Sequence, residues 1–358
     1  MSNEKPPSLL IRADADRIIG TGHIMRCLAL AQAWQATGGG VHFISAELLD
    51  GLAARLSAES FRVTRVSATV GSRQDALATR EIVANEGGCL FLDGYQFDND
   101  FRRTVKRDAW LLGMIDDYSH QDTYTVDVLL NQNLAIAGTL YPQRSSHTQL
   151  LLGSSYALLR KEFIERRQPP QEAPQVARKV LITLGGSDPD NVTQRVIRAL
   201  LQIDDSRMQA RIVVGAGNPH YQSLCEEASR ASFELRLERS TPHMPQLMAW
   251  ADVAVSAGGS TCWELACMGV PHLVLVLAEN QLGIARALDR EHGDVSLGWF
   301  HQCSEQQIAR QLNVLIHDQA KRQRLAQQGQ QLIDGQGAYR VARALREEYR
   351  KRNAGQAA

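Results

Sequence analysis

Short apolar runs recur along the chain, and many of them end in glycine or acidic residues that lead into a segment with helical spacing. The runs cover residues 9–13, 41–45, 61–66, 89–93, 110–115, 126–130, 179–184, 210–215, 233–237, 253–256 and 271–277. Continuous apolar runs of this length are typical of strands buried on both faces, and alternation with helices favours parallel sheets. The sequence therefore predicts an α/β fold with a site along the carboxyl edges of its strands.

The chain has 358 residues, which is long for one hydrophobic core, so two domains are expected. The alternation breaks over residues 161–178, which are charged and rich in proline and are predicted to form a linker. A long surface loop within one domain is the alternative for that stretch. We expect domains at residues 1–160 and 179–335, and a basic helix within residues 336–358 that either packs on the first domain or is simply solvated.

Charge and hydropathy exclude several classes of function. The chain has 39 Lys and Arg against 39 Asp and Glu, which argues against electrostatic binding to nucleic acid or to an anionic membrane. No stretch has the apolar length needed to span a bilayer, and the first seven residues lack a signal-peptide core. We therefore expect a cytoplasmic protein with no stable membrane insertion. Its oligomeric state stays open, and a monomer is compatible with the sequence.

The six cysteines are scattered, and only two of them are close together. Cys262 and Cys267 fall within one predicted helix and lack a histidine pair at ligand spacing. We expect reduced thiols, no metal site and no cofactor.

The segment from residue 9 to residue 34 has the most informative pattern. A predicted strand leads into a loop with Gly20 and Gly22, and a helix then opens near His23. This places His23 in the first turn of a helix, at the carboxyl end of a parallel strand, where open α/β sheets bind ligands. The helix dipole disfavours imidazolium there, so His23 is a candidate general base. The alternative is a histidine that only caps the helix or packs.

Other polar residues near this segment are candidates for the same site. Gly22, Asp14 and Arg26 are expected to contribute to substrate binding, and Asp14 or Asp16 is a candidate to orient His23. Tyr95 follows Asp93 and Gly94, and we expect Gly94 to expose it in a cleft. Any of the acidic residues at the strand ends could instead cap a helix; besides Asp14 and Asp16 these are Asp93, Asp116 and Asp117.

Two loops in the second half follow predicted strands and contain Gly-Gly-Ser, at residues 185–187 and 258–260. Glycine lets backbone N–H groups approach an anion, and the following helix N-terminus adds a favourable dipole. Neither loop has the lysine of a Walker loop or the GxGxxG pattern. We predict a diphosphate site formed by Gly186, Ser187, Gly259, Ser260 and Thr261.

Three further residues of the second half are candidates for contacts to the rest of a nucleotide sugar. Glu264 lies one turn into a predicted helix, where its carboxylate could accept ribose hydroxyls or merely complement the helix dipole. The sequence leaves both roles open. Asn280 and Gln281 supply amides suited to hydroxyl or acetamido groups, although a surface loop is the simpler expectation for this pair.

These motifs resemble the UDP-sugar hydrolases of pseudaminic acid biosynthesis, and the resemblance covers most of the chain. The segment Gly22-His23-Ile24-Met25-Arg26-Cys27 is its most specific part. Further matching motifs lie at residues 12–14, 92–95, 115–117, 130–133, 152–160, 183–189, 256–264 and 278–281. The motifs of the second half are shared more broadly with glycosyltransferases that are similar to the lipid II GlcNAc transferase.

The resemblance implies a GT-B fold, with two Rossmann-like domains whose parallel sheets face each other across a cleft. It also implies that the second domain binds UDP and that His23, Tyr95 and Asn280 act in catalysis. The implied reaction is metal-independent attack of water on the anomeric carbon of UDP-2,4-diacetamido-2,4,6-trideoxy-β-L-altrose, with C–O cleavage and inversion. The UDP-sugar and the UDP product are then the expected partners.

Other functions stay open at this point. A GT-B glycosyltransferase would use the same UDP-sugar site and deliver the sugar to an acceptor. A non-catalytic nucleotide-sugar-binding protein would not need a histidine at a helix start. A non-hydrolysing UDP-sugar epimerase shares the architecture, but would need more carboxylates around the sugar.

Overall fold

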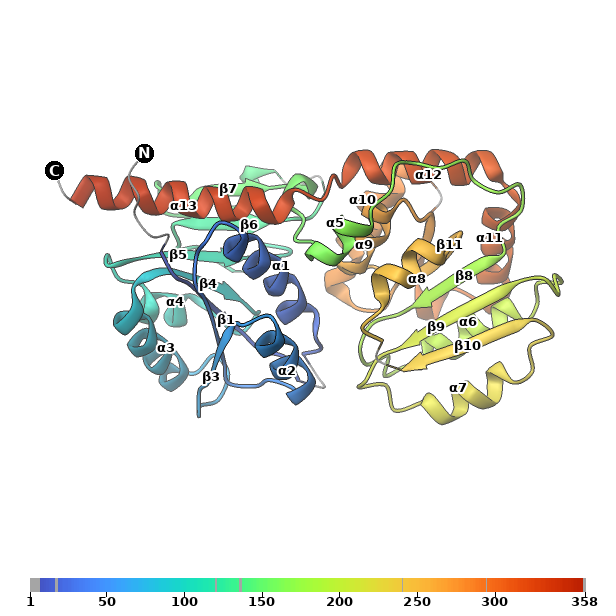
Figure 1. Cartoon of the computed structure of the whole chain (residues 1–358), viewed down its shortest axis with the longest axis horizontal. Coiled ribbons are helices and arrows are strands. Elements are labelled where there is room, and N and C mark those ends of the chain that lie inside the picture. Colours follow the sequence, from blue (N-terminus) through green and yellow to red (C-terminus); the bar gives the residue numbers. More distant parts are fainter. Residues whose placement is uncertain are drawn as a thin grey trace. The chain divides into compact units, whose positions relative to one another are not determined.

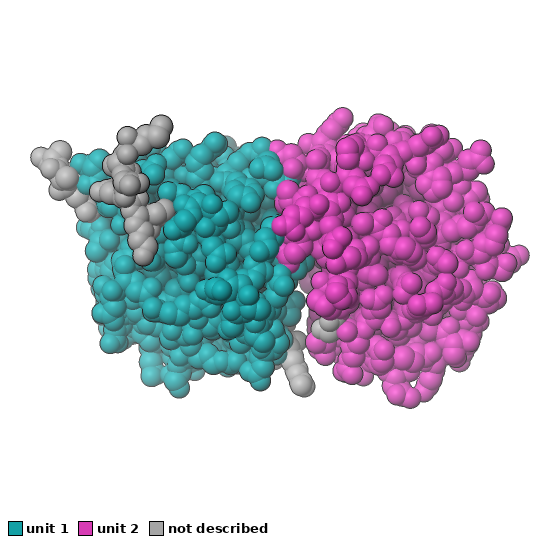
Figure 2. All heavy atoms as spheres, viewed as in Figure 1, with its two compact units in different colours: residues 1–161, 335–358 teal, residues 162–334 magenta. Residues whose placement is uncertain are grey.

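The computed structural model describes residues 7–16, 19–119, 121–134, 137–239, 241–293 and 295–356. The chain divides into two compact units, shown in different colours in Figure 2: unit 1 comprises Met1–Lys161 and Gly335–Ala358, and unit 2 comprises Glu162–Asp334. Arg17 and Ile18, which belong to the glycine-bearing loop before His23, lie outside the described residues. The chain thus passes from unit 1 to unit 2 at the start of the expected linker, and returns to unit 1 for its last helix.

Unit 1 contains a sheet of seven described strands, all parallel, in the order β3-β2-β1-β4-β5-β6-β7. The strands are β1 (Leu9–Ala13), β2 (Val41–Ser45), β3 (Arg62–Arg65), β4 (Gly88–Asp93), β5 (Trp110–Ile115), β6 (Val128–Asn131) and β7 (Gln149–Leu152). The helices are α1 (Gly22–Ala36), α2 (Asp50–Ala58), α3 (Arg73–Glu86), α4 (Asn99–Val105) and α13 (Gly337–Gln356), with 3₁₀ turns at Gly138–Leu140 and Ser154–Tyr156.

Helices cover both faces of this sheet, because alternate residues of each buried strand enter different cores (Figure 1). Leu9 and Ile11 of β1 pack with α1 and α13, whereas Leu10 packs with α3 and α4. The last helix, α13, contributes Leu345 to the first of these cores, and Leu345 is fully buried. Residues 335–358 are therefore part of unit 1 in the structure.

Unit 2 contains a second sheet of six described strands, again parallel, in the order β10-β9-β8-β11-β12-β13. The strands are β8 (Lys179–Thr183), β9 (Gln209–Val214), β10 (Glu234–Arg239), β11 (Val253–Ala257), β12 (His272–Val276) and β13 (Ser296–Trp299). The helices are α5 (Lys161–Arg166), α6 (Val192–Leu200), α7 (Tyr221–Ala228), α8 (Met244–Trp250), α9 (Thr261–Met268), α10 (Glu279–His292), α11 (Glu305–His317) and α12 (Gln319–Leu332), with a 3₁₀ turn at Phe300–Gln302.

The six strands of unit 2 follow the same order as the first six strands of unit 1, and this order indicates where a ligand site is expected. In each unit the first strand lies inside the sheet, and the chain adds strands on one side of it before it crosses to the other. The order reverses between β1 and β4 in unit 1 and between β8 and β11 in unit 2. Ligands of doubly wound sheets bind at the carboxyl ends of the two strands that flank such a switch point.

Several predicted elements need correction. The sequence predicts a helix from about Asp190 to Leu201, with Asp188 as its N-cap and Pro189 in its first turn. In the structure this helix, α6, begins at Val192, and Pro189 lies in the turn before it. The carboxylate of Asp188 still caps this helix, since it accepts hydrogen bonds from the N–H groups of Val192 and Thr193 at 2.8 and 2.9 Å. The loop expected at Asn280 and Gln281 is wrong, because both residues lie in the first turn of α10. Strands β7 and β13 were not predicted.

Among the described helices, none combines the length and the apolar character that a membrane crossing requires.

Candidate active site

His23 and Asp93 meet at the switch point of unit 1. His23 is the second residue of α1, which follows β1, and Asp93 is the last residue of β4, the neighbouring strand. The Nδ1 atom of His23 lies 2.6 Å from Oδ1 of Asp93. Nδ1 also lies 3.2 Å from the guanidinium of Arg26, but the contact with Asp93 is the shorter one, and a carboxylate only accepts hydrogen bonds. We therefore place a proton on Nδ1, so that Nε2 of the neutral imidazole carries the lone pair. The arrangement is an Asp–His pair of the kind that orients a general base.

Arg26 joins Asp93 to a second carboxylate. Its guanidinium donates to both oxygens of Asp93, at 2.6 and 2.7 Å, and to Asp117 at 2.8 Å. Burial alone would raise the pKa of Asp93, but the charges and hydrogen bonds of Arg26 and His23 outweigh it and hold this pKa well below its usual range. Asp93 is therefore ionised at neutral pH.

The charges in this cluster explain what it can do. Asp93 and Asp117 carry two negative charges, Arg26 carries one positive charge, and the cluster has a net charge of about −1 while His23 is neutral. When Nε2 of His23 takes a proton, the cluster becomes neutral. The cluster therefore stabilises the imidazolium that forms when His23 acts as a base.

Tyr95 completes the surroundings of His23. Its ring packs edge to face against the imidazole, with 5.1 Å between the centroids, and its hydroxyl donates to Asp117 at 2.7 Å. His23 is 8% exposed, so the residue is buried except for a small part of its surface. The structure therefore brings together three of the predicted residues, His23, Arg26 and Tyr95.

The prediction that Asp14 or Asp16 orients His23 is wrong, because that position belongs to Asp93. Asp14 is buried, and its carboxylate accepts from the N–H groups of Ala46 and Glu47 and from Arg12. It ties the loops after β1 and β2 together, so its groups are already used within the protein and not presented to a substrate.

Gly20 and Gly22 lie in the chain just before His23. Gly20 has a φ of +79°, a conformation that favours glycine. No other part of the described chain comes within 4 Å of the position that a Cβ atom of Gly22 would occupy. The backbone beside His23 is therefore open on this side, which suits the predicted role of Gly22 in binding.

In unit 2 the two predicted glycine loops follow β8 and β11, the strands at its switch point. The second loop leads into α9, whose N-cap residue Ser260 makes no side-chain capping bond. Within the described ranges, the N–H groups of Ser260 and Thr261 have no acceptor, and the space around the α-carbon of Gly259 is open. The start of α9 is therefore available to an anion.

The first glycine loop is less suited to a phosphate than the sequence suggested. The buried carboxylate of Asp188 already occupies the N-terminus of α6 and would repel an anion there. The carbonyl of Gly186 accepts from Gly217 at 3.0 Å, whereas Ser187 stays partly exposed. An anion in unit 2 would therefore bind mainly at the second loop, with Gly186 and Ser187 at its margin.

Glu264, Asn280 and Gln281 lie along the same edge of the sheet, since α9 follows β11 and α10 follows the adjacent strand β12. Glu264 is partly exposed in the first turn of α9. Asn280 is exposed, whereas the Oε1 atom of Gln281 accepts from the N–H of Leu277 at 2.9 Å. Gln281 is thus part of the turn that leads into α10, and Asn280 is the amide of the pair that faces solvent.

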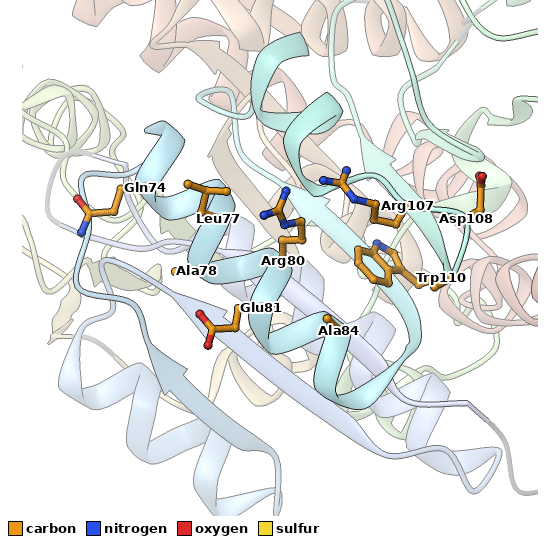
Figure 3. A pocket seen from close by; sticks show the side chains of 10 residues that line it. Gln74, Leu77, Ala78, Arg80, Glu81, Ala84, Arg107, Asp108 and Trp110 are labelled. Atoms are coloured by element: carbon orange, nitrogen blue, oxygen red, sulfur yellow. The ribbon is translucent and has the colours of Figure 1, made fainter.

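A hollow of about 880 Å³ lies elsewhere in unit 1 (Figure 3). Its walls are α3, through residues such as Leu77 and Arg80, and the segment around Arg107 and Trp110. Trp110 is the first residue of β5, so the hollow lies at the amino-terminal edge of the sheet, opposite to His23. It holds none of the predicted site residues. Among the described residues, no group of three or more His, Cys, Asp and Glu side chains could hold a metal ion.

Asp93 is the residue that sequence reasoning did not assign. It lies 70 positions from His23, and only the pairing of β4 with β1 brings the two together. Its position at the end of an apolar run was visible in the sequence, but the strand order was not.

Comparison with known proteins agrees with this architecture. Residues 180–341 match the glycosyltransferase family 28 C-terminal domain. Over its length the chain is similar to a crystal structure of MurG from Acinetobacter baumannii, with a TM-score of 0.63, 15% identity, and coverage of 96% of this chain and 100% of that one. This likeness confirms the predicted GT-B fold of two parallel-sheet α/β domains.

Two curated relatives share more sequence with the chain. It is 28% identical over 204 residues to the spore coat polysaccharide biosynthesis protein SpsG of Bacillus subtilis, which covers 57% of this chain and 60% of that protein. It is 26% identical over 234 residues, 62% of this chain, to a Helicobacter pylori protein named pseudaminic acid cytidylyltransferase and UDP-2,4-diacetamido-2,4,6-trideoxy-β-L-altropyranose hydrolase. The match spans 39% of that second protein, so the chain covers less than two thirds of either relative.

Proposed function

We propose that the chain is a nucleotide-sugar hydrolase that releases UDP from UDP-2,4-diacetamido-2,4,6-trideoxy-β-L-altrose. The main support for this proposal is the Asp93–His23 pair, in which a buried carboxylate holds Nδ1 of the imidazole and leaves Nε2 to accept a proton. The name of the Helicobacter pylori relative supports the choice of substrate. The family 28 match supports a nucleotide-sugar site in unit 2.

In the proposed reaction a water molecule attacks the anomeric carbon of the sugar. Nε2 of His23 accepts one proton of the water as the new C–O bond forms, and the bond from the anomeric carbon to the diphosphate oxygen breaks. The electron pair of that bond leaves with UDP, and attack from the opposite face inverts the anomeric configuration. Asp93 keeps the imidazole in the required tautomer and stabilises the imidazolium.

The departing diphosphate needs stabilisation, which we assign to the second glycine loop of unit 2. The N–H groups of Ser260 and Thr261 and the dipole of α9 favour the negative charge that develops on UDP. Glu264 is proposed to accept the ribose hydroxyls, and Asn280 to bind an acetamido group of the sugar. Tyr95, which packs on His23, is proposed to limit the freedom of the imidazole.

The alternative is a GT-B glycosyltransferase that uses the same donor. The family 28 match and the likeness to MurG favour this alternative, since both concern transferases. In a transferase the base would deprotonate an acceptor hydroxyl rather than water. The two functions therefore differ in what happens when no acceptor is present.

The decisive experiment incubates the purified chain with the UDP-linked diacetamido-trideoxy-altrose in ¹⁸O-labelled water without any acceptor. We expect catalytic release of UDP, with the label on the anomeric oxygen of the sugar, as determined by mass spectrometry. Label on the phosphate would contradict attack at carbon. Release of UDP only after an acceptor is added would establish the transferase instead.

The same assay tests the base. We expect His23→Ala to lower turnover by about 10²- to 10⁴-fold, because a general base contributes about this much. His317→Ala, which removes an exposed histidine of α11 in unit 2, serves as the matched control and should keep wild-type turnover. Near-normal turnover of His23→Ala would remove His23 from the mechanism.

A further inference from the structure

Tyr118 is an exposed aromatic residue on the active-site edge of unit 1. It follows Asp117, three residues after the end of β5, and 49% of its surface is exposed. Among the large apolar side chains that the structure describes as exposed, it is the most exposed one. A single exposed ring is ordinary in itself, and what distinguishes Tyr118 is that its ring lies beside Tyr95, which packs on His23.

The backbone around Tyr118 is firmly held although its ring is at the surface. Asp116 is buried, and one of its carboxylate oxygens accepts from the N–H of Ser119 at 2.7 Å and from the hydroxyl of Tyr141 at 2.8 Å. Ser119 has a φ of +57°, which is uncommon for a residue other than glycine. Asn133 donates to the carbonyl of Asp117 at 2.7 Å. The turn therefore presents the ring of Tyr118 in a defined place.

Ring contacts connect Tyr118 to the proposed base. The ring centroids of Tyr118 and Tyr95 are 5.5 Å apart, and those of Tyr95 and His23 are 5.1 Å apart. The same Asp117 that precedes Tyr118 accepts from the hydroxyl of Tyr95. Three rings thus lead from the proposed base to the surface, and a sugar whose anomeric carbon lies at His23 would extend along them.

We propose that the ring of Tyr118 is a platform for the apolar face of the substrate's sugar, and that it favours 6-deoxy sugars. This inference rests on the proposed function, because it assumes that the sugar is bound beside His23. C–H groups and a methyl group pack favourably on an aromatic face, whereas a hydroxymethyl group would lose water contacts there. Leu140, whose carbonyl accepts from Ser119, is 45% exposed and adds apolar surface at the same turn.

The test measures binding rather than turnover. Its probe is a phosphonate analogue of the UDP-linked diacetamido-trideoxy sugar, in which a CH₂ group replaces the glycosidic oxygen so that it cannot be hydrolysed. Titration calorimetry gives its affinity and that of UDP alone. We expect Tyr118→Ala to weaken binding of the analogue roughly tenfold and to leave binding of UDP unchanged. Tyr118→Phe, which keeps the ring, should bind both ligands like the wild type.

Tyr339→Ala is the matched control, because Tyr339 is a tyrosine of similar exposure, 41%, on α13 of the same unit. It should bind both ligands normally. A second analogue with a hydroxymethyl group at C5 should bind the wild type more weakly than the 6-deoxy analogue does. In Tyr118→Ala the affinities for the two analogues should differ less than in the wild type.

Several results would overturn the inference. Tyr118→Ala could bind the analogue with the affinity of the wild type, or it could bind the analogue and UDP equally more weakly. Tyr118→Phe could lose as much affinity for the analogue as Tyr118→Ala does. Wild-type protein that binds the analogue no more tightly than UDP would also overturn it. A lack of hydrolysis in labelled water is a separate outcome, which overturns the proposed function. The affinities of the Tyr118 variants for the analogue and for UDP are measured independently of that assay.

Discussion

Asp93 accepts hydrogen bonds from His23 and Arg26 at once, and its replacement by asparagine tests both contacts. We expect Asp93→Asn to lower kcat by about 10²- to 10⁴-fold, because an amide can donate to Nδ1 and so favour the wrong tautomer of His23. The variant should also be less stable by about 3 kcal/mol, since Arg26 loses a buried partner. Steady-state kinetics and denaturant unfolding measure the two effects.

Asp122→Asn is the control for this variant, because Asp122 is an exposed aspartate of the same unit. It should behave like the wild type. A circular dichroism spectrum and an unfolding transition of unit 1 like those of the wild type would show that Asp93→Asn is folded. A kcat within about twofold of the wild type would contradict a role for Asp93 in positioning the base.

Glu264 offers a second test at the residue scale, since the sequence left open whether it binds ribose or complements the dipole of α9. We expect Glu264→Ala to weaken UDP binding by about tenfold to a hundredfold, as loss of hydrogen bonds to a charged group does. Glu305→Ala is the matched control, because Glu305 is also a first-turn glutamate of unit 2, in α11. Unchanged UDP affinity with a small loss of stability in both variants would make Glu264 structural.

Sequence reasoning at this scale succeeds where the signal is local. The two loop glycines and the helical spacing after them are enough to place His23 at a helix start, where the structure has it. The partner of His23 could not be predicted, because Asp93 reaches it only through the pairing of β1 with β4. The acidic residues closer in sequence, Asp14 and Asp16, therefore looked like better candidates than they are.

At the scale of single elements, strands were predicted best. The strands at Leu9–Ala13 and Trp110–Ile115 coincide with their apolar runs, because both are buried along their whole length. Helix α10 was missed, since its first turn reads as polar loop and Gly283 interrupts its apolar spacing. The start of α6 was placed two residues early, because a capping carboxylate usually lies closer to the helix than Asp188 does.

A buried histidine of strand β12 predicts that the stability of unit 2 depends on pH. The first residue of this strand, His272, is buried, and its Nδ1 donates to the carbonyl of Val270 at 2.9 Å. Burial lowers the pKa of His272 to about 4, against the weaker opposing effect of that hydrogen bond. In the unfolded chain the pKa of a histidine is about 6.5. Between about pH 6.5 and pH 4, His272 is therefore protonated in the unfolded chain and neutral in the folded unit, and this difference favours unfolding.

Acidification should therefore destabilise unit 2, by about 2 kcal/mol from this residue between about pH 7 and pH 5. Chemical unfolding at the two pH values, followed by a signal from unit 2, measures this effect. His272→Leu should remove this part of the pH dependence, whereas His317→Ala, which changes an exposed histidine, should keep it. An identical pH dependence in His272→Leu and the wild type would contradict the prediction.

At the scale of the whole molecule, unit 1 is built from two separate stretches of the sequence, and unit 2 lies between them. Each unit has its own hydrophobic core. Leu345 of α13 is fully buried in a core of unit 1. We expect Leu345→Ala to destabilise unit 1 by about 2–5 kcal/mol, because it leaves a cavity among packed side chains. Calorimetric unfolding with and without UDP assigns the transitions, since UDP should stabilise the unit that binds it.

The control for this variant is Arg343→Ala, on the exposed side of the same helix. It should leave both transitions in place. If Leu345→Ala lowered the stability of both units equally, this would contradict the conclusion that α13 contributes to the core of unit 1 alone. The repeated strand order, by contrast, could not be predicted from the sequence, because each apolar run is compatible with several positions in a sheet.

The return of α13 to unit 1 has a consequence for synthesis on the ribosome. Translation completes the whole of unit 2 before the residues of α13 leave the exit tunnel, because residues 335–358 follow residues 162–334. At ordinary elongation rates, synthesis of unit 2 takes on the order of ten to thirty seconds. During this time the apolar side chains of unit 1 that pack against Leu345 stay uncovered. The second unit in the sequence is thus the first that can finish folding, and the first unit completes its core only when residues 335–358 have been made.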